Sequence, residues 1–371
     1  RLPMQKKGEK MSITPEAVNQ AISTVVDDNL QTDYVSARSV KNIQIDGNDV
    51  SLTIEMGYPA KSLHEFIRNR VTAALRKIDG IGKIHVDVDT KIVTHEVQRG
   101  VKPLPDIKNI IAVSSGKGGV GKSTTTANLA LALAAEGARV GILDADIYGP
   151  SQPSLMGISE KPTSSDGKNM DPIIQYGLQL MSIGFMMDSV QPLAWRAPMI
   201  TQAVMQLLQQ TKWQDLDYLL IDMPPGTGDI QLTLSQKAPL TGAIVVTTPQ
   251  DVAVLDARKG LMMFQKMNVD VLGIVENMSS YVCSHCGQIE HIFGKDGGKL
   301  MSEAYGVDSL GEIPLNIAVR EQTDNGKPVV VAEPDGLMAG IFRDIACRLA
   351  AKVALKPKDT SGLFPPIVKA E

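Results

Sequence analysis

A glycine-rich loop carries the strongest chemical signal in the sequence. Residues 114–124 read SSGKGGVGKST and match G-x-x-x-x-G-K-[ST] in full. Glycines let successive backbone N–H groups turn toward phosphate oxygens, and the N-terminus of the following helix adds positive potential. Lys122 is then placed to bind the β- and γ-phosphates, and the Ser123 hydroxyl to bind Mg²⁺. The alternative, a glycine-rich turn that binds nothing, is disfavoured by the apolar run before the loop and the Ala/Leu-rich stretch after it. The residues predicted to contact the nucleotide here are Gly116, Lys117, Gly118, Gly119, Val120, Gly121, Lys122, Ser123 and Thr124.

Two acidic segments at the ends of apolar runs complete this candidate site. Asp144 and Asp146 follow one such run, and Asp222 follows another. Open α/β sheets bind ligands at the carboxyl ends of their strands. Asp222 is expected to hold Mg²⁺ through water, and Gly226 to offer a backbone N–H to the γ-phosphate. Because no N-K-x-D guanine signature occurs, the sequence favours ATP over GTP.

Lys117 directly follows the first glycine of the loop, which is unusual for this motif. The extra lysine makes the loop resemble the deviant Walker A type, K-G-G-x-G-K-[ST]. In that class the lysine reaches across a dimer to the nucleotide of the partner. A solvated surface lysine is the alternative interpretation.

A close pair of cysteines, Cys283 and Cys286, lies in the sequence CSHCG. Two thiolates at this spacing can hold one metal ion or one face of an iron–sulfur cluster. Zinc and a [4Fe–4S] cluster both require four ligands, so two copies of the chain would have to bring their pairs together. His285 and His291 could instead complete a zinc site within one chain. A redox disulfide and two incidental thiols are the other interpretations. Cys347 is expected to be a packed thiol on a helix.

The composition limits the class of protein. The chain has 371 residues, and 37 Lys and Arg against 41 Asp and Glu give a formal net charge of −4. No field of one sign covers such a molecule, so nucleic-acid binding through bulk charge is not expected. Three cysteines are too few for a disulfide framework and indicate a reducing compartment. No run approaches the roughly 18 apolar residues of a membrane span, so we expect a cytoplasmic protein with no membrane partner.

Before the loop, hydropathy patterning predicts a small α+β domain over residues 11–91, with the order αββαβ. The expected elements are a helix over 14–28, strands over 40–46 and 50–56, a helix over 62–78 and a strand over 84–88. Residues 1–10 carry four basic side chains and one acidic side chain, without apolar periodicity. They are interpreted either as a flexible leader or as residues foreign to the natural chain.

The rest of the chain predicts a doubly wound α/β domain over residues 108–355, after a linker over 92–107. Short unbroken apolar runs are typical of buried parallel strands with helices on both faces of the sheet. These runs lie at 110–113, 140–143, 218–221, 243–246 and 271–275. The tail, 356–371, has no periodicity and is expected to be loose.

Together these motifs resemble the Mrp/ApbC family of iron–sulfur cluster carriers, relatives of MinD and of the nitrogenase iron protein. The resemblance covers residues 105–355. It rests on the deviant loop, D-A-D-I-Y-G-P-S at 144–151, the segment 222–229, T-P-Q-D at 248–251, and E-N-M at 276–278 with the cysteine pair. The αββαβ segment more weakly resembles the small iron–sulfur assembly domain that is often fused to these carriers, although it contains no cysteine.

The resemblance implies roles for residues of the nucleotide site. Lys117 would act in trans on the nucleotide of a second protomer, and Lys122 and Ser123 would hold phosphate and Mg²⁺. Asp146 would orient the attacking water, Asp222 would support the metal, and Asn277 would read adenine. The segment L-A-W-R-A-P at 193–198 is similar to a W-R-G-P motif of the family, with no firm role for Arg196.

The same resemblance implies that Cys283 and Cys286 bind a [4Fe–4S] cluster bridged between two protomers. It predicts a slow ATPase that works as a homodimer. This homodimer would receive clusters from donors and deliver them to apo-proteins. A MinD/ParA-like positioning ATPase is one alternative, but it needs a basic amphipathic terminal helix, and residues 335–354 are more typical of a helix packed on the sheet. A zinc-binding adaptor or metallochaperone is the other.

Overall fold

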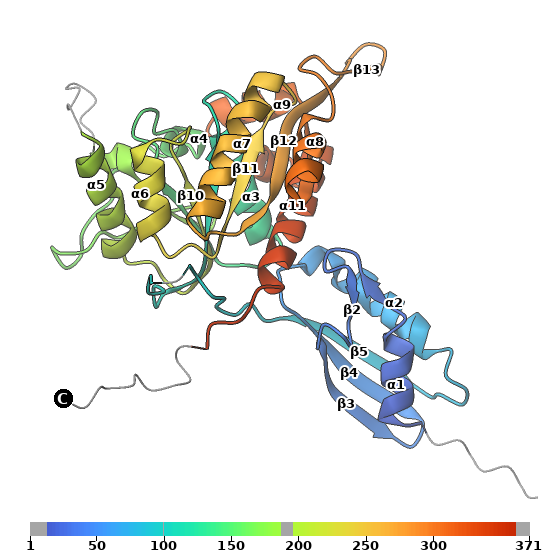
Figure 1. The fold of residues 1–371 in the computed structure, drawn as a ribbon. Coiled ribbons are helices and arrows are strands. Elements are labelled where there is room, and N and C mark those ends of the chain that lie inside the picture. Colours follow the sequence, from blue (N-terminus) through green and yellow to red (C-terminus); the bar gives the residue numbers. More distant parts are fainter. Residues whose placement is uncertain (1–12, 99, 187–195, 361–371) are drawn as a thin grey trace, which may run out of the picture. The chain divides into compact units, whose positions relative to one another are not determined.

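The computed structural model describes residues 13–98, 100–186 and 196–360, and it divides the chain into two compact units, residues 1–92 and 93–371 (Figure 1). The predicted leader, residues 1–10, lies outside the described residues. Among the described residues, no helix combines the length and the apolar character needed to cross a bilayer.

The smaller unit has the predicted αββαβ order. Its elements are α1 (Pro15–Ile22), β3 (Val40–Asp46), β4 (Asp49–Met56), α2 (His64–Leu75) and β5 (Ile84–Thr90). β3 pairs antiparallel with β4, and β4 pairs parallel with β5. Alternate residues of β4 are buried, as the period-two pattern predicted, because one face of the sheet carries the core of this unit.

The helix predicted over 14–28 was wrong in its second half, because α1 ends at Ile22. The Ser23 and Thr24 hydroxyls donate hydrogen bonds to backbone carbonyls of the last helical turn, at 2.8 and 2.7 Å. Such local bonds compete with helix continuation. The following residues form a short antiparallel pair, β1 (Val26–Asp27) with β2 (Thr32–Asp33).

The larger unit is a doubly wound sheet, as predicted (Figure 1). In spatial order the strands are β14 (Ser309–Leu315), β12 (Val271–Val282), β11 (Gly242–Thr247), β6 (Ile107–Ser115), β10 (Leu216–Asp222), β7 (Val140–Asp144), β9 (Leu178–Ser182) and β8 (Ile173–Gln175), with β13 (Ile289–Glu290) also beside β12. All neighbouring pairs are parallel except those made by β8 and β13. β10 and β11 are buried along their whole length, which explains their unbroken apolar runs.

Helices cover both faces of this sheet. One face carries α3 (Lys122–Ala135) and α11 (Leu337–Ala354), and the other carries α5 (Ala197–Gln210), α6 (Asp229–Lys237), α7 (Asp251–Lys266) and α8 (Gly297–Tyr305) (Figure 1). α11 buries Ile345 and Leu349, so it is packed in the unit as predicted, and not displayed as a surface anchor.

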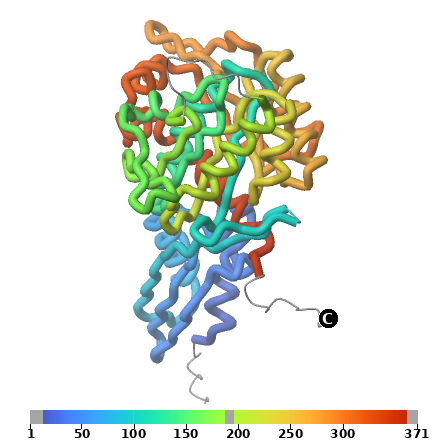
Figure 2. Tube along the Cα trace, turned by 90° about the vertical axis from the view of Figure 1, so that its left-hand side faces the viewer, coloured from blue at the N-terminus to red at the C-terminus, as the bar shows by residue number. Residues whose placement is uncertain are grey.

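The expected linker and the start of the expected loose tail are both fixed within the larger unit. Within the expected linker, His95 is buried and its Nδ1 lies 3.0 Å from Asn109 Oδ1. Residues 94–96 also pair with the start of the expected tail. The N–H of Glu96 donates to the Pro357 carbonyl, and the N–H of Asp359 to the Thr94 carbonyl, both at 3.0 Å (Figure 2). The expected tail is therefore held by backbone bonds up to this point, and residues 361–371 lie outside the described residues.

Candidate functional site

The parallel sheet brings the predicted phosphate loop and both acidic segments to one edge. β6 runs into the loop, and α3 begins at Lys122 directly after it. In the strand register Asp222 of β10 lies opposite Val113 of β6 on one side and opposite Asp144 of β7 on the other. Strands separated by a hundred residues of chain therefore end next to one another, as the sequence predicted.

A buried ion pair lies at the centre of this edge. Lys122 Nζ lies 2.6 Å from Asp222 Oδ1 and 3.6 Å from Asp146 Oδ2. The same ammonium group lies 3.2 Å from the Ser123 hydroxyl oxygen. Asp222 is fully buried, and a carboxylate in such a place has to be paired and hydrogen-bonded. The site thus holds one cation and two carboxylates ready to exchange partners with a charged ligand.

Asp144 accepts three hydrogen bonds within this cluster. They come from the Ser182 hydroxyl at 3.0 Å and from the backbone N–H groups of Gln152 and Asp146, each at 3.1 Å. Burial, and then the nearby charge of Asp222, raise the pKa of Asp144. Burial also raises the pKa of Asp146, which the charge of Lys122 opposes. Asp144 and Asp146 therefore lose their protons less readily than exposed carboxyl groups do.

Gln152, the first residue of α4 (Gln152–Leu155), is a site residue that the sequence reasoning missed. Its side chain is fully buried, and Nε2 donates to Asp222 Oδ2 and to the Ser123 carbonyl, both at 2.9 Å. Thr126, also missed, donates to Asp222 Oδ1 at 3.2 Å. The motif D-A-D-I-Y-G-P-S ends at residue 151, directly before Gln152. Because glutamine is usually exposed, its residue type gave no sign that the side chain is buried here.

A cavity of about 230 Å³ adjoins the loop on the side of β12 and β14. Gly121 and Asn277 line it, together with residues 313–316 of the β14 end and residues of α9 (Ile317–Asp324). Asn277 Nδ2 donates to the Val120 carbonyl at 2.9 Å. Gly121 has φ +83°, a conformation that is strained for other residues, and a Cβ there would displace the Asn277 amide, whose Nδ2 would lie 2.1 Å away. The residue expected to read the base therefore lies against the phosphate loop.

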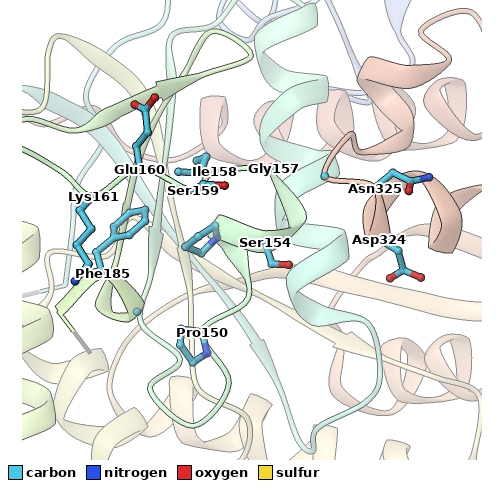
Figure 3. Close-up of a pocket in the computed structure, with 13 residues that line it drawn as sticks. Pro150, Ser154, Gly157, Ile158, Ser159, Glu160, Lys161, Phe185, Asp324 and Asn325 are labelled. Carbon is cyan, nitrogen blue, oxygen red and sulfur yellow. The ribbon is translucent and has the colours of Figure 1, made fainter. Parts of the chain in front are cut away.

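A second cavity, of about 560 Å³, lies beside the β7–α4 loop. Figure 3 shows Glu160, Lys161 and Phe185 on one side of it and Asp324 and Asn325 on the other. No residue of the phosphate loop lines this cavity. Of these two cavities, only the smaller one adjoins the phosphate loop.

Three predicted residues of the nucleotide site need comment. The N–H of Gly226 donates to the Ser115 carbonyl at 2.8 Å, so it is not directed at a phosphate in this structure. Lys117 is half-buried and forms no ion pair among the residues that the structure describes. Arg196 is exposed and occupies the N-cap position of α5 without a side-chain capping hydrogen bond. Residues 193–195 of its motif lie outside the described residues.

The cysteine pair lies in the turn of a hairpin. β12 leads into Cys283, β13 follows the turn, and Cys283 and Gln288 are joined by a backbone hydrogen bond of 2.9 Å. Backbone N–H groups of Cys286 and then His285 donate to the Cys283 sulfur and lower its pKa, which favours the thiolate. Cys283 is half-exposed and Cys286 is exposed, whereas Cys347 is buried, as predicted.

His285 and His291, the possible nitrogen ligands of a zinc site within one chain, are not gathered with the two thiols in this structure. His285 Nδ1 lies 3.2 Å from the Ser284 hydroxyl oxygen, and His291 Nδ1 lies 2.9 Å from the Ser279 carbonyl. Across the described ranges, no three His, Cys, Asp or Glu side chains gather as a metal site would require. One chain thus offers two thiols at this place and no third ligand among its described residues.

Comparison with protein families matches both units. Residues 106–350 match the family described as NUBPL iron-transfer P-loop NTPase, and residues 15–88 match the family described as iron-sulfur cluster assembly protein. The resemblance inferred from the motifs is confirmed for both units.

Individual relatives support the same family assignment. An iron-sulfur cluster carrier protein of Pseudomonas fragi is 54% identical over 275 residues, which are 74% of this chain and 96% of that protein. One from Escherichia coli (strain K12) is 51% identical over 308 residues, 82% of this chain and 84% of that protein. A solved nucleotide-binding protein of Archaeoglobus fulgidus, in complex with ADP, is 38% identical with a TM-score of 0.56, and the match covers 64% of this chain and 93% of that one. Because the fold, the motifs and the sequence comparisons all agree, the chain belongs to the family of iron-transfer P-loop NTPases.

Proposed function

We propose that this protein is an ATP-dependent carrier of [4Fe–4S] clusters. Two copies of the chain hold one cluster between their cysteine pairs, receive it from a donor protein and pass it to apo-proteins. Hydrolysis of ATP is slow, because the nucleotide acts as a conformational switch. The free thiols require a reducing compartment, so we place the activity in the cytoplasm, with no membrane or nucleic acid as partner.

The observation that carries this proposal is the half-complete ligand set of the hairpin. Cys283 and Cys286 are accessible, and Cys283 is the thiol whose backbone surroundings favour the thiolate. A [4Fe–4S] cluster takes four thiolates, and the described residues of one chain bring two to this place. A second copy supplies the other two with the same geometry. The names of the relatives, iron-sulfur cluster carrier proteins, support iron and sulfide as the cargo.

The nucleotide half of the proposal follows from the buried cluster around Asp222. The Ser123 hydroxyl and the Asp222 carboxylate are hard oxygen donors of the type that Mg²⁺ prefers, so this donor set fits the metal. Mg²⁺ bound with ATP neutralises phosphate charge. Lys122 leaves Asp222 to bind the β- and γ-phosphates, Asp146 orients the attacking water, and Lys117 reaches the nucleotide of the second copy.

β12 links the two halves of the site. Asn277 contacts the phosphate loop, and the same strand reaches Cys283 six residues later. Met278 between them has φ +57°, a conformation that a residue with a side chain adopts only under constraint. β12 is therefore the direct chain connection between the nucleotide site and the thiols, with an irregular register between Asn277 and Tyr281.

Anaerobic reconstitution with iron and sulfide tests the proposal. The wild-type protein should form a dimer with four iron and four sulfide per two chains, whereas Cys283→Ala and Cys286→Ala should lose the cluster absorbance. Cys347→Ala is the matched control, because this thiol is buried in α11 away from the hairpin, and it should load like the wild type. Equal loading of all four proteins would contradict the proposal, and zinc in place of iron would favour the metallochaperone alternative.

A further inference from the structure

The side chain of Gln152 contacts both residues that are proposed to bind Mg²⁺. Its Nε2 donates to Asp222 Oδ2 and to the Ser123 carbonyl, both at 2.9 Å. The backbone N–H of the same residue donates to Asp144 Oδ2 at 3.1 Å. Because Gln152 is also completely buried, its side chain is held in one place from both ends.

The two partners of the amide decide which of its ends faces them. A carboxylate and a backbone carbonyl only accept hydrogen bonds, so the atom between them has to be the nitrogen, which has two N–H groups to donate. The amide oxygen, Oε1, is therefore the other end. It is buried and has no hydrogen-bond partner in the described part of the chain. Since an unpaired buried acceptor is costly, this oxygen is expected to take a donor from a ligand of the site.

The ligands of the proposed function differ in what they can offer Oε1. Phosphate oxygens of ATP are themselves acceptors and do not pair with a carbonyl oxygen. A protein-bound Mg²⁺ ion usually keeps several waters, and each of these waters has O–H groups to donate. Because Gln152 contacts both Ser123 and Asp222, its amide lies next to the residues that would surround such waters.

We propose that Oε1 of Gln152 accepts a hydrogen bond from a water bound to Mg²⁺, while Nε2 keeps the Asp222 carboxylate in place. This inference rests on the proposed function, and it makes Gln152 a positioning residue for the metal. A neutral amide suits this place, because two carboxylates, Asp146 and Asp222, already lie near the single ammonium group of Lys122. A glutamate here would add a third negative charge and would have no N–H group for Asp222.

Binding of Mn²⁺, in place of Mg²⁺, to the complex of the full chain with ADP tests the proposal. Electron paramagnetic resonance of free Mn²⁺ gives the dissociation constant of the metal without any measurement of hydrolysis. Gln152→Leu and Gln152→Met both lack the amide, and the unbranched methionine keeps the length of the side chain if leucine disturbs the fold. Thr126→Val is the matched comparison, because Thr126 also donates to Asp222, at 3.2 Å, but its loss leaves Oε1 in place.

The affinity of each protein for ADP in the presence of a chelator shows whether the phosphate loop itself is intact. For both Gln152 variants, the loss of metal affinity should exceed the loss of this metal-free ADP affinity at least about fivefold. Losses of equal size would show a general disturbance of the site and would overturn the proposal.

Both Gln152 variants should bind Mn²⁺ about 10–100-fold more weakly than the wild type, which is the usual effect of removing a group that supports metal ligands. Thr126→Val should cost at least about fivefold less, because it removes only a donor to Asp222. Metal affinity equal to that of the wild type in the Gln152 variants, or an equal loss in Thr126→Val, would overturn the role of Oε1 and leave the proposed function intact. Failure of the wild type to bind Mn²⁺ together with ADP would instead refute the nucleotide half of the proposed function.

Discussion

Replacement of Gln152 by leucine tests whether this glutamine holds the buried carboxylate cluster together. The variant loses two hydrogen bonds from Nε2, to Asp222 Oδ2 and to the Ser123 carbonyl, each 2.9 Å long. A bond to a charged group contributes about 1.5–3 kcal/mol and a neutral one about 1 kcal/mol. Because Asp222 is fully buried, water cannot replace the lost donor. Leucine also removes the buried Oε1 of Gln152, which has no hydrogen-bond partner among the described residues and so offsets part of this loss. The free energy of unfolding of the larger unit should therefore fall by about 1–3 kcal/mol.

Urea unfolding followed by tryptophan fluorescence measures this change in the right unit, because both tryptophans, Trp195 and Trp213, belong to residues 93–371. Gln206→Leu is the matched control. Gln206 is exposed on α5, so its replacement should change the free energy by no more than about 0.5 kcal/mol. A loss below about 1 kcal/mol for Gln152→Leu would refute the reasoning, since the glutamine would then contribute no more than a neutral bond.

Three further outcomes are expected. Gly116→Ala places a Cβ 2.1 Å from a backbone carbon of α7, so it should cost about 1–3 kcal/mol or more and lower the melting temperature, whereas Gly118→Ala, with open space around it, should not. Because backbone N–H groups of the turn lower the pKa of Cys283, iodoacetamide should alkylate it at a pH below the usual thiol range, and mass spectrometry should find buried Cys347 unmodified. Burial, and then a neighbouring carboxylate, raise the pKa of Asp144 to about 7. Protonation of this group therefore stabilises the folded wild type at low pH, and this contribution to the free energy of unfolding should be lost as the pH rises from about 4 to about 7. Asp144→Asn should lack this pH dependence in urea titrations. Equal melting temperatures of the two glycine variants would contradict the first prediction, and alkylation of Cys283 only at the ordinary thiol pH would contradict the second. The third would be contradicted if the stability of Asp144→Asn changed with pH as steeply as that of the wild type.

The buried cluster around Asp222, the candidate nucleotide site, contains residues that the sequence singled out and residues that it did not. Lys122, Ser123 and Asp222 were predicted, because their motif lies in one short stretch or directly after an apolar strand. Gln152 and Thr126 were not, although both donate to the same buried carboxylate. Gln152 lies about seventy residues from Asp222 along the chain, and Thr126 about a hundred. A local sequence pattern does not predict contacts over such separations.

Element boundaries show the same limit. The strand predicted over 40–46 was found with those bounds, because turn residues delimit it. The helix predicted over 14–28 ended six residues early, because Ser23 and Thr24 bond back to the helix and Val26 begins a strand. Periodicity alone does not distinguish a β-branched helical turn from the start of a strand.

By itself the sequence determined the class of fold, the phosphate loop, the acids at the strand ends and the cysteine pair, because each of these depends on the residue types and spacing within a single segment. The tertiary structure alone decided which distant groups meet. It pairs Lys122 with Asp222, sets Asn277 against the loop, fixes residues 94–96 to 357–359, and leaves Val282 and Ile289 exposed beside the thiols. Burial and contact are properties of the packed sheet and helices, since they depend on where remote parts of the chain are brought together.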